Sequence, residues 1–107
     1  MTRDEILAME PGRELDALVA EKVMGWTHYR EEWGGVVPDS ISHYSTDISA
    51  AWEVVEKMGP FTQLTADIYN GITVWHCSFS VVDSVDAVTA PEAICKAALL
   101  AALEVTE

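Results

Sequence analysis

The segment WTHYREEW, residues 26–33, gathers the side chains that could do chemistry in this sequence. It holds three aromatic rings on which a planar ligand can stack, with a histidine and an arginine as hydrogen-bond donors between them. A guanidinium also binds phosphate through two parallel hydrogen bonds. We therefore predict a binding site for a planar, nucleotide-like ligand at Trp26, His28, Tyr29, Arg30 and Trp33. The alternative is that the tryptophans pack on the edge of the fold and Arg30 pairs with a neighbouring glutamate.

The remaining histidines and cysteines do not have the spacing of a metal or nucleophile site. No C-x-x-C or H-x-x-x-H pair occurs, and the sequence has neither a G-x-S-x-G elbow nor a glycine-rich phosphate loop. His76 and Cys77 are adjacent on an expected strand, so their side chains point to opposite faces and cannot share one metal ion. Cys95 lies in an apolar helix, where burial makes a thiol inert. We expect no catalytic residue, metal or cofactor.

The length and the net charge of the chain limit the number of domains and the kind of partner. The 107 residues suit one domain spanning the whole chain, 1–107. With 18 acidic and 6 basic residues the formal net charge is -12, which repels phosphate backbones, so we expect no direct binding of nucleic acid. This charge suits a basic protein partner, or simply keeps a domain with 50% hydrophobic residues soluble. The longest apolar run, Ala97–Leu103, is far below the ~20 residues of a membrane span, and residues 1–12 lack a signal peptide. We expect a cytoplasmic protein with free thiols.

Helical patterns come first along the chain. Thr2 and Glu5 have the spacing of a capping box at the start of a short helix. A second helix is expected at about residues 13–24, with Leu15, Leu18, Val19 and Val23 on one face and Asp16 away from it. Gly25 suits the left-handed position that follows such a helix. Residues 26–44 have no sustained period, and a connection of this length within a compact domain is typically functional or flexible.

A third helix is expected to run to Met58 and to be capped by Ser45, Thr46 or Asp47. Its apolar residues, Ile48, Ala51, Trp52, Val55 and Met58, follow helical spacing and predict one buried face. By this pattern Trp52 belongs to the core. Gly59 and Pro60 end the helix.

The second half of the chain predicts a small sheet and a final helix. Two β-branched runs surround Asn70-Gly71, a hairpin signal, and in the second run the face of Trp75, Cys77, Phe79 and Val81 is the one expected to meet the helices. A third, short strand is expected at about residues 85–88. A capping-box spacing at Thr89 and Glu92 begins a helix that is apolar nearly all round. Because a domain of this size can hardly cover every side of such a helix, we expect a homo-oligomer, most simply a dimer.

Three blocks of the sequence together resemble the phage ABA sandwich domain family: MTRDEILAMEPGRELDALVAEKVMGW, HYSTDISAAWEVVEKM and TAPEAICKAALLAALE. They cover a little over half of the chain, whereas the connection at residues 26–44 and the sheet region at residues 61–88 add no family signature. The members of this family are small proteins of bacteriophages and prophages and have no established activity. The resemblance implies an α/β fold, a helix–sheet–helix (α/β/α) sandwich with a small, mostly antiparallel sheet, and it implies no catalytic residues.

The resemblance also sets the functional expectation. Small phage proteins without enzymatic motifs often bind and neutralise host defences, so we expect a non-enzymatic accessory protein in the cytoplasm of the bacterial host, during infection or lysogeny. It would sequester a host nucleotide-like immune signal or inhibit a host defence protein. Two alternatives stay open, an acidic DNA mimic or protein-interaction inhibitor, and a structural or housekeeping phage protein. Basic residues gathered at a pocket would favour sequestration, and acidic residues in a spaced row would favour mimicry.

Overall fold

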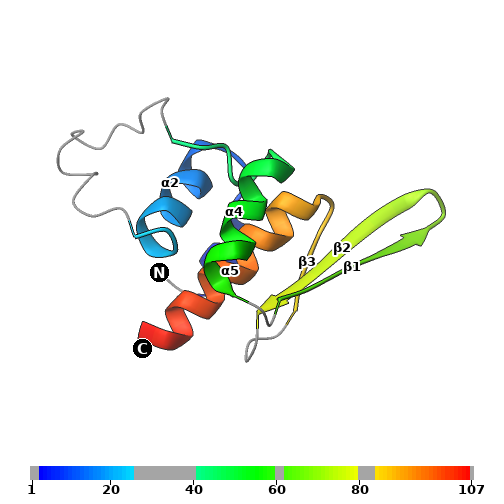
Figure 1. Ribbon diagram of the computed structural model, residues 1–107. Coiled ribbons are helices and arrows are strands. Elements are labelled where there is room, and N and C mark those ends of the chain that lie inside the picture. The colour runs from blue at the N-terminus through cyan, green and yellow to red at the C-terminus, as the bar shows by residue number, and fades with distance from the viewer. Residues whose placement is uncertain (1–2, 26–40, 60–61, 80–83, 107) are drawn as a thin grey trace.

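The computed structural model describes residues 3–25, 41–59, 62–79 and 84–106, with side chains up to residue 102. Within these described ranges, three helices, a sheet of three strands and a last helix follow one another in chain order (Figure 1). Their bounds are α1 Arg3–Ala8, α2 Arg13–Lys22, α4 Ile48–Met58, β1 Thr62–Tyr69, β2 Ile72–Phe79, β3 Val85–Ala87 and α5 Ala90–Thr106. The expected mixed α/β class, helix–sheet–helix with a small antiparallel sheet, is confirmed.

Local signals in the sequence set the ends of two helices. Asp47 is the N-cap of α4, and its carboxylate accepts a hydrogen bond of 2.9 Å from the backbone N–H of Ser49. The hydroxyl of Thr89 accepts one of 3.4 Å from the backbone N–H of Glu92 at the start of α5. Both side chains satisfy a backbone donor that has no partner within the helix. The predicted caps of these two helices are therefore confirmed.

The sheet has the order β1-β2-β3, and both strand pairs are antiparallel. Asn70 and Gly71 form the β1–β2 turn with positive φ angles of 49° and 80°, as the Asn-Gly signal predicts. The register places Cys77 between Leu64 and Val85, on the face that meets the helices. Cys77 and Phe79 are buried and Trp75 packs partly against the core, which confirms the predicted face for these three residues. Val81 lies outside the described residues.

Helix α5 lies at the centre of the fold. It contacts β2 and β3 on one side and α1, α2 and α4 on its other sides (Figure 1). Every side chain from Ala93 to Ala101 is buried, including Leu99 and Leu100. The expectation that one chain could not cover this helix is wrong for these residues, because its many alanines let neighbouring elements approach closely on all sides. Within the described ranges, none of the helices has both the length and the apolar content that crossing a bilayer requires.

Asp16 corrects the predicted polar face of α2. Its side chain is 2% exposed and accepts hydrogen bonds from the backbone N–H of Ser45 at 2.7 Å and from the Ser45 hydroxyl at 2.6 Å. The same hydroxyl accepts a hydrogen bond of 2.9 Å from the backbone N–H of Gly12. This carboxylate ties α2 to the segment before α4. It can be buried because its Oδ1 accepts two hydrogen bonds and its Oδ2 lies 3.8 Å from Nδ1 of His43, contacts that the helical pattern alone does not reveal.

The buried face of α4 also differs from the prediction. Ala50, Ala51 and Val54 are the buried residues of this helix, whereas Ile48 is 48% and Trp52 is 51% exposed. The prediction that Trp52 is a core residue is therefore wrong. α4 packs closely on α5, and small residues allow this close approach. The larger side chains of Ile48 and Trp52 lie next to this helix–helix contact and stay about half exposed.

Candidate functional site

The ligand site predicted from the sequence lies outside the described residues. Trp26, His28, Tyr29, Arg30 and Trp33 all belong to residues 26–40, which lie outside the described residues. The proposal that they stack and hold a planar ligand stays a prediction from the sequence.

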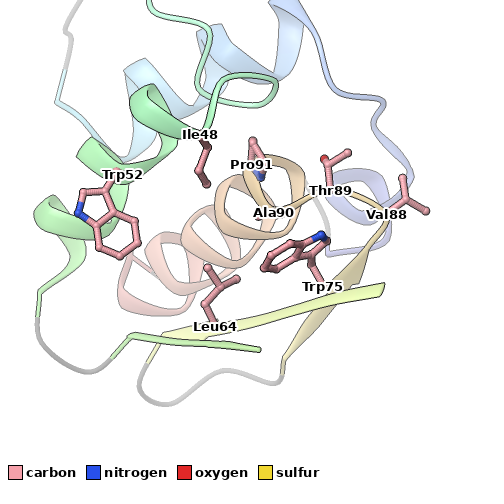
Figure 2. A pocket seen from close by; sticks show the side chains of 8 residues that line it. All are labelled: Ile48, Trp52, Leu64, Trp75, Val88, Thr89, Ala90 and Pro91. Carbon is pink, nitrogen blue, oxygen red and sulfur yellow. The ribbon is translucent and has the colours of Figure 1, made fainter. Parts of the chain in front are cut away.

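The described residues form a different candidate site, an apolar groove between α4, the sheet and the start of α5. Its volume is about 520 Å³. The lining side chains come from four elements and one loop, and are Ile48, Trp52, Leu64, Trp75, Val88, Thr89, Ala90 and Pro91. Figure 2 shows the two indole rings on opposite sides of the hollow, with Leu64 and Ile48 between them. We call this the two-tryptophan groove.

Each wall of the two-tryptophan groove follows from a local feature. Ile48 and Trp52 are four residues apart, so they lie on the same side of α4 and one turn from each other. Leu64 and Trp75 lie on the face of the sheet that carries Cys77, because Leu64 pairs with Cys77 and Trp75 is two residues from it on β2. The last wall is the turn from β3 into α5, where Val88 is 68% exposed.

The chemistry of this groove is that of apolar contact and stacking. An indole exposes a large flat face, and stacking of a nucleic-acid base on an aromatic side chain contributes about 1–3 kcal/mol. None of the described lining residues is charged, so the groove suits an uncharged planar or aliphatic group. Pockets for small molecules have volumes of about 300–1,000 Å³ and mostly apolar walls, and this groove falls within that class.

The sequence did not predict this groove, because its pattern assigned the large apolar residues of α4, including Ile48 and Trp52, to one buried face. A signal was nevertheless present. Ala50, Ala51 and Val54 make a second helical stripe of small residues, and a helix with two apolar stripes has more apolar surface than one contact buries. Only the position of α5 decides which stripe is covered.

A polar cluster lies on the opposite face of the sheet. His76 on β2 contacts Asp86 on β3 through Nδ1 at 2.6 Å and Asp67 on β1 through Nε2 at 2.8 Å. Each ring nitrogen thus meets a carboxylate, an arrangement that favours the doubly protonated ring. The hydrogen bond to Asp86 has the largest effect on the pKa of His76. Burial, which lowers the pKa, comes next, and the hydrogen bond to Asp67 again raises it, so that the pKa lies above its usual 6.5.

This cluster is poorly suited to catalysis or metal binding. A histidine that acts as a general base needs one ring nitrogen free for the nucleophile, and here both nitrogens are engaged by carboxylates. The two carboxylates meet different ring nitrogens and therefore do not converge on one point. In the parts of the chain that the structure describes, no group of three or more His, Cys, Asp and Glu side chains could hold a metal ion.

The two cysteines are free and buried. Burial raises the pKa of the Cys77 thiol to about 12, and it also raises the pKa of Cys95. Neither thiol forms an appreciable amount of thiolate near neutral pH, so neither has the character of a nucleophile or a metal ligand. This agrees with the sequence-based expectation for Cys95 and extends it to Cys77.

Comparisons with known proteins point to phages. Residues 17–99 match the family described as the phage ABA sandwich domain. The chain is also similar to a solved structure, a phage protein from Bacillus cereus ATCC 14579, with 32% sequence identity and a TM-score of 0.64. The similarity covers 86% of this chain and 91% of the Bacillus protein. No curated protein matches the chain. The two-tryptophan groove lies entirely within the residues that match the family.

Proposed function

The chain belongs to the phage ABA sandwich domain family, and from that premise we propose that it is a non-enzymatic accessory protein of a phage or prophage that acts by binding. It would work in the cytoplasm of the bacterial host, without a cofactor, and sequester a host immune signal that contains a planar ring. The observation that carries this proposal is the two-tryptophan groove, in which Trp52 is left 51% exposed beside a hollow of about 520 Å³.

The assignment of a binding role rests on the chemistry of the described residues. His76 has both ring nitrogens engaged by carboxylates, and both thiols are buried with raised pKa values. By contrast, an exposed tryptophan in a concave apolar site is the kind of residue that dominates binding energy, because it buries a large area on contact. These side chains favour recognition over reaction.

The groove accounts for the planar part of such a signal. A nucleobase between Trp52 and Trp75 would gain stacking on an indole and lose contact with water on both faces. The described walls provide no cation for a phosphate, so the anionic part of the signal falls to Arg30 of the predicted segment.

The test is a titration of the purified protein with cyclic nucleotides and NAD-derived signals, followed by tryptophan fluorescence and by melting. We expect at least one ligand to quench the fluorescence of the wild type. Trp52→Ala should then lose tenfold or more in affinity, since each factor of ten corresponds to about 1.4 kcal/mol and one stacked ring contributes about 1–3 kcal/mol. Arg30→Ala should reduce the affinity by a similar factor and should leave the melting temperature nearly unchanged.

The matched control is Ile72→Ala, which removes an apolar side chain of comparable exposure, 60%, from the far end of the β1–β2 hairpin. It should bind the ligand as the wild type does. Trp52→Ala should melt close to the wild type, because half of this side chain is already in water, and the 3–5 kcal/mol cost of a core aromatic does not apply. If no ligand of the panel binds the wild type, sequestration fails for that panel.

A second candidate, inhibition of a host defence protein, is favoured by the charges next to the groove. Glu53 and Glu56 are exposed on α4, and Glu56 is one helical turn from Trp52. Together with the net charge of -12, these carboxylates suit a partner whose surface combines an apolar projection with basic residues. A purified host defence protein whose binding weakens both with Glu56→Lys and with added salt would support this candidate over sequestration.

A further inference from the structure

The outer end of the β1–β2 hairpin is an apolar surface without a cover. The hairpin extends past the helices (Figure 1), and at its end Ile68 is 73%, Tyr69 64% and Ile72 60% exposed. A two-stranded hairpin is at best marginally stable in water when nothing packs on it. Of these three side chains, Ile68 lies on β1 and on the face of the sheet that carries Leu64 and Cys77, so it is the one that a partner along the β1 edge would cover.

The outer edge of β1 is open as well. β1 is the first strand of the sheet order, and no described segment pairs with its outer side. The backbone carbonyl of Tyr69 and the N–H of Ile72 flank the two-residue turn, and hydrogen-bonded pairs alternate from there along the strand. Leu64, Ala66 and Ile68 therefore present their backbone groups to the open edge. β1 contains neither proline nor lysine, the residues that commonly protect such an edge.

The charge distribution indicates which partner can approach. A second copy also carries a net charge of -12, so most of its surface repels the first copy. Asp67 is the sole charged residue from Thr62 to Trp75, and its carboxylate is held by His76. The β1 edge is thus a surface on which two copies can meet with little repulsion.

We propose that β1 is a dimerisation surface, on which two copies of this chain pair β1 to β1 in antiparallel orientation about a two-fold axis at Ala66. The two sheets then form one continuous sheet. This dimer contact lies at a different place from the one expected from the apolar α5, whose residues 93–101 are buried within the chain.

The alternation of the strand selects this register. With Ala66 opposite Ala66 of the second copy, Ile68 lies opposite Leu64 of that copy, and both side chains are on the face that carries the two-tryptophan groove. The exposed end of each hairpin then lies beside the helix-covered end of the other. A slip by one residue would put the two groove faces on opposite sides of the sheet and leave Ile68 opposite the polar Gln63.

The proposal is independent of the ligand of the groove, because it needs neither Trp52 nor the 26–33 segment. A protein that dimerises and binds no nucleotide would contradict the proposed function alone. A monomer that binds a nucleotide would contradict the dimer alone.

The first measurement is sedimentation velocity of the full chain from about 1 to 200 µM. We expect a dimer that dissociates on dilution. Ile68→Lys places a charge where the register brings an apolar contact, and it should raise the dimer dissociation constant at least tenfold. Ile72→Lys is the matched control, since its side chain is similarly exposed but lies on β2 and on the other face of the sheet. It should leave the dissociation constant within about twofold. Circular dichroism of both variants shows whether the fold is kept.

The second measurement tests the register. Directly opposite residues of a hydrogen-bonded antiparallel pair have Cα atoms about 5.5 Å apart, within the range of a disulfide. Ala66→Cys should therefore form a covalent dimer under mild oxidation, while the buried Cys77 and Cys95 stay unreactive. Thr65→Cys is the control, because the two copies of this residue would be about 8 Å apart, too far for a disulfide. A wild type that is monomeric at 200 µM, or a dimer that withstands Ile68→Lys, would overturn the proposal, as would faster cross-linking of Thr65→Cys than of Ala66→Cys.

Discussion

Removal of the Asp16 carboxylate should destabilise the fold far more than removal of any exposed acid. In Asp16→Ala the buried N–H and hydroxyl of Ser45 lose the oxygen that accepts both hydrogen bonds, at 2.7 and 2.6 Å. A buried donor left without a partner costs about 1–3 kcal/mol, and two such donors are affected. The hydroxyl can turn to the Gly12 carbonyl oxygen, 3.3 Å away, which recovers part of its loss. We therefore expect a decrease in the free energy of unfolding of about 3 kcal/mol.

Urea denaturation followed by circular dichroism measures this decrease, with Glu56→Ala as the control. Glu56 is exposed on α4, so its removal should change the free energy of unfolding by no more than about 0.5 kcal/mol. Asp16→Asn keeps an oxygen that can accept both hydrogen bonds and loses only the charge, so it should cost about 1 kcal/mol.

A double-mutant cycle with Ser45→Ala separates the contact from other effects of the substitution. Because the two side chains share one network, the double variant should lose less than the sum of the single losses, by about 1 kcal/mol or more. Two results would contradict this reasoning. One is a decrease in the free energy of unfolding of less than about 1 kcal/mol in Asp16→Ala, and the other is a double variant whose decrease equals the sum of the two single decreases.

Two further predictions follow from the sheet and from α5. Because Asp86 and Asp67 raise the pKa of His76 in the folded state, the protonated ring stabilises the fold fully below pH about 6.5, and this contribution is lost as the pH rises through the raised pKa. The difference in melting temperature between wild type and His76→Gln should accordingly be largest near pH 6 and shrink towards pH 9, and a difference that grows with pH would contradict the assignment. Leu100→Glu should prevent folding, since this side chain is 3% exposed and an unpaired carboxylate would be buried, whereas Val88→Glu, at an exposed site, should give a folded protein by circular dichroism.

Much of the secondary structure could be predicted from the sequence, because its signals act over a few residues. The Asn70-Gly71 pair sets a two-residue turn through its positive φ angles, and that turn fixes the register of the hairpin. Asp47 and Thr89 cap their helices through hydrogen bonds to backbone groups two and three residues away. The alternation in β2 likewise identified Cys77 and Phe79 as the buried face. The family resemblance placed these elements in the right class of fold.

The tertiary structure decided which surfaces of these elements are covered, because that depends on neighbours distant in the sequence. Trp52 is exposed since α4 packs on α5 through Ala51 and Val54, and no pattern within the helix distinguishes the two apolar stripes. Asp16 is buried because Ser45, 29 residues later in the chain, satisfies its carboxylate. His76 meets two carboxylates only because β1 and β3 flank β2. Local periodicity determines which residues share a face, whereas burial, charge and the candidate groove arise from contacts that form only when the whole chain is folded.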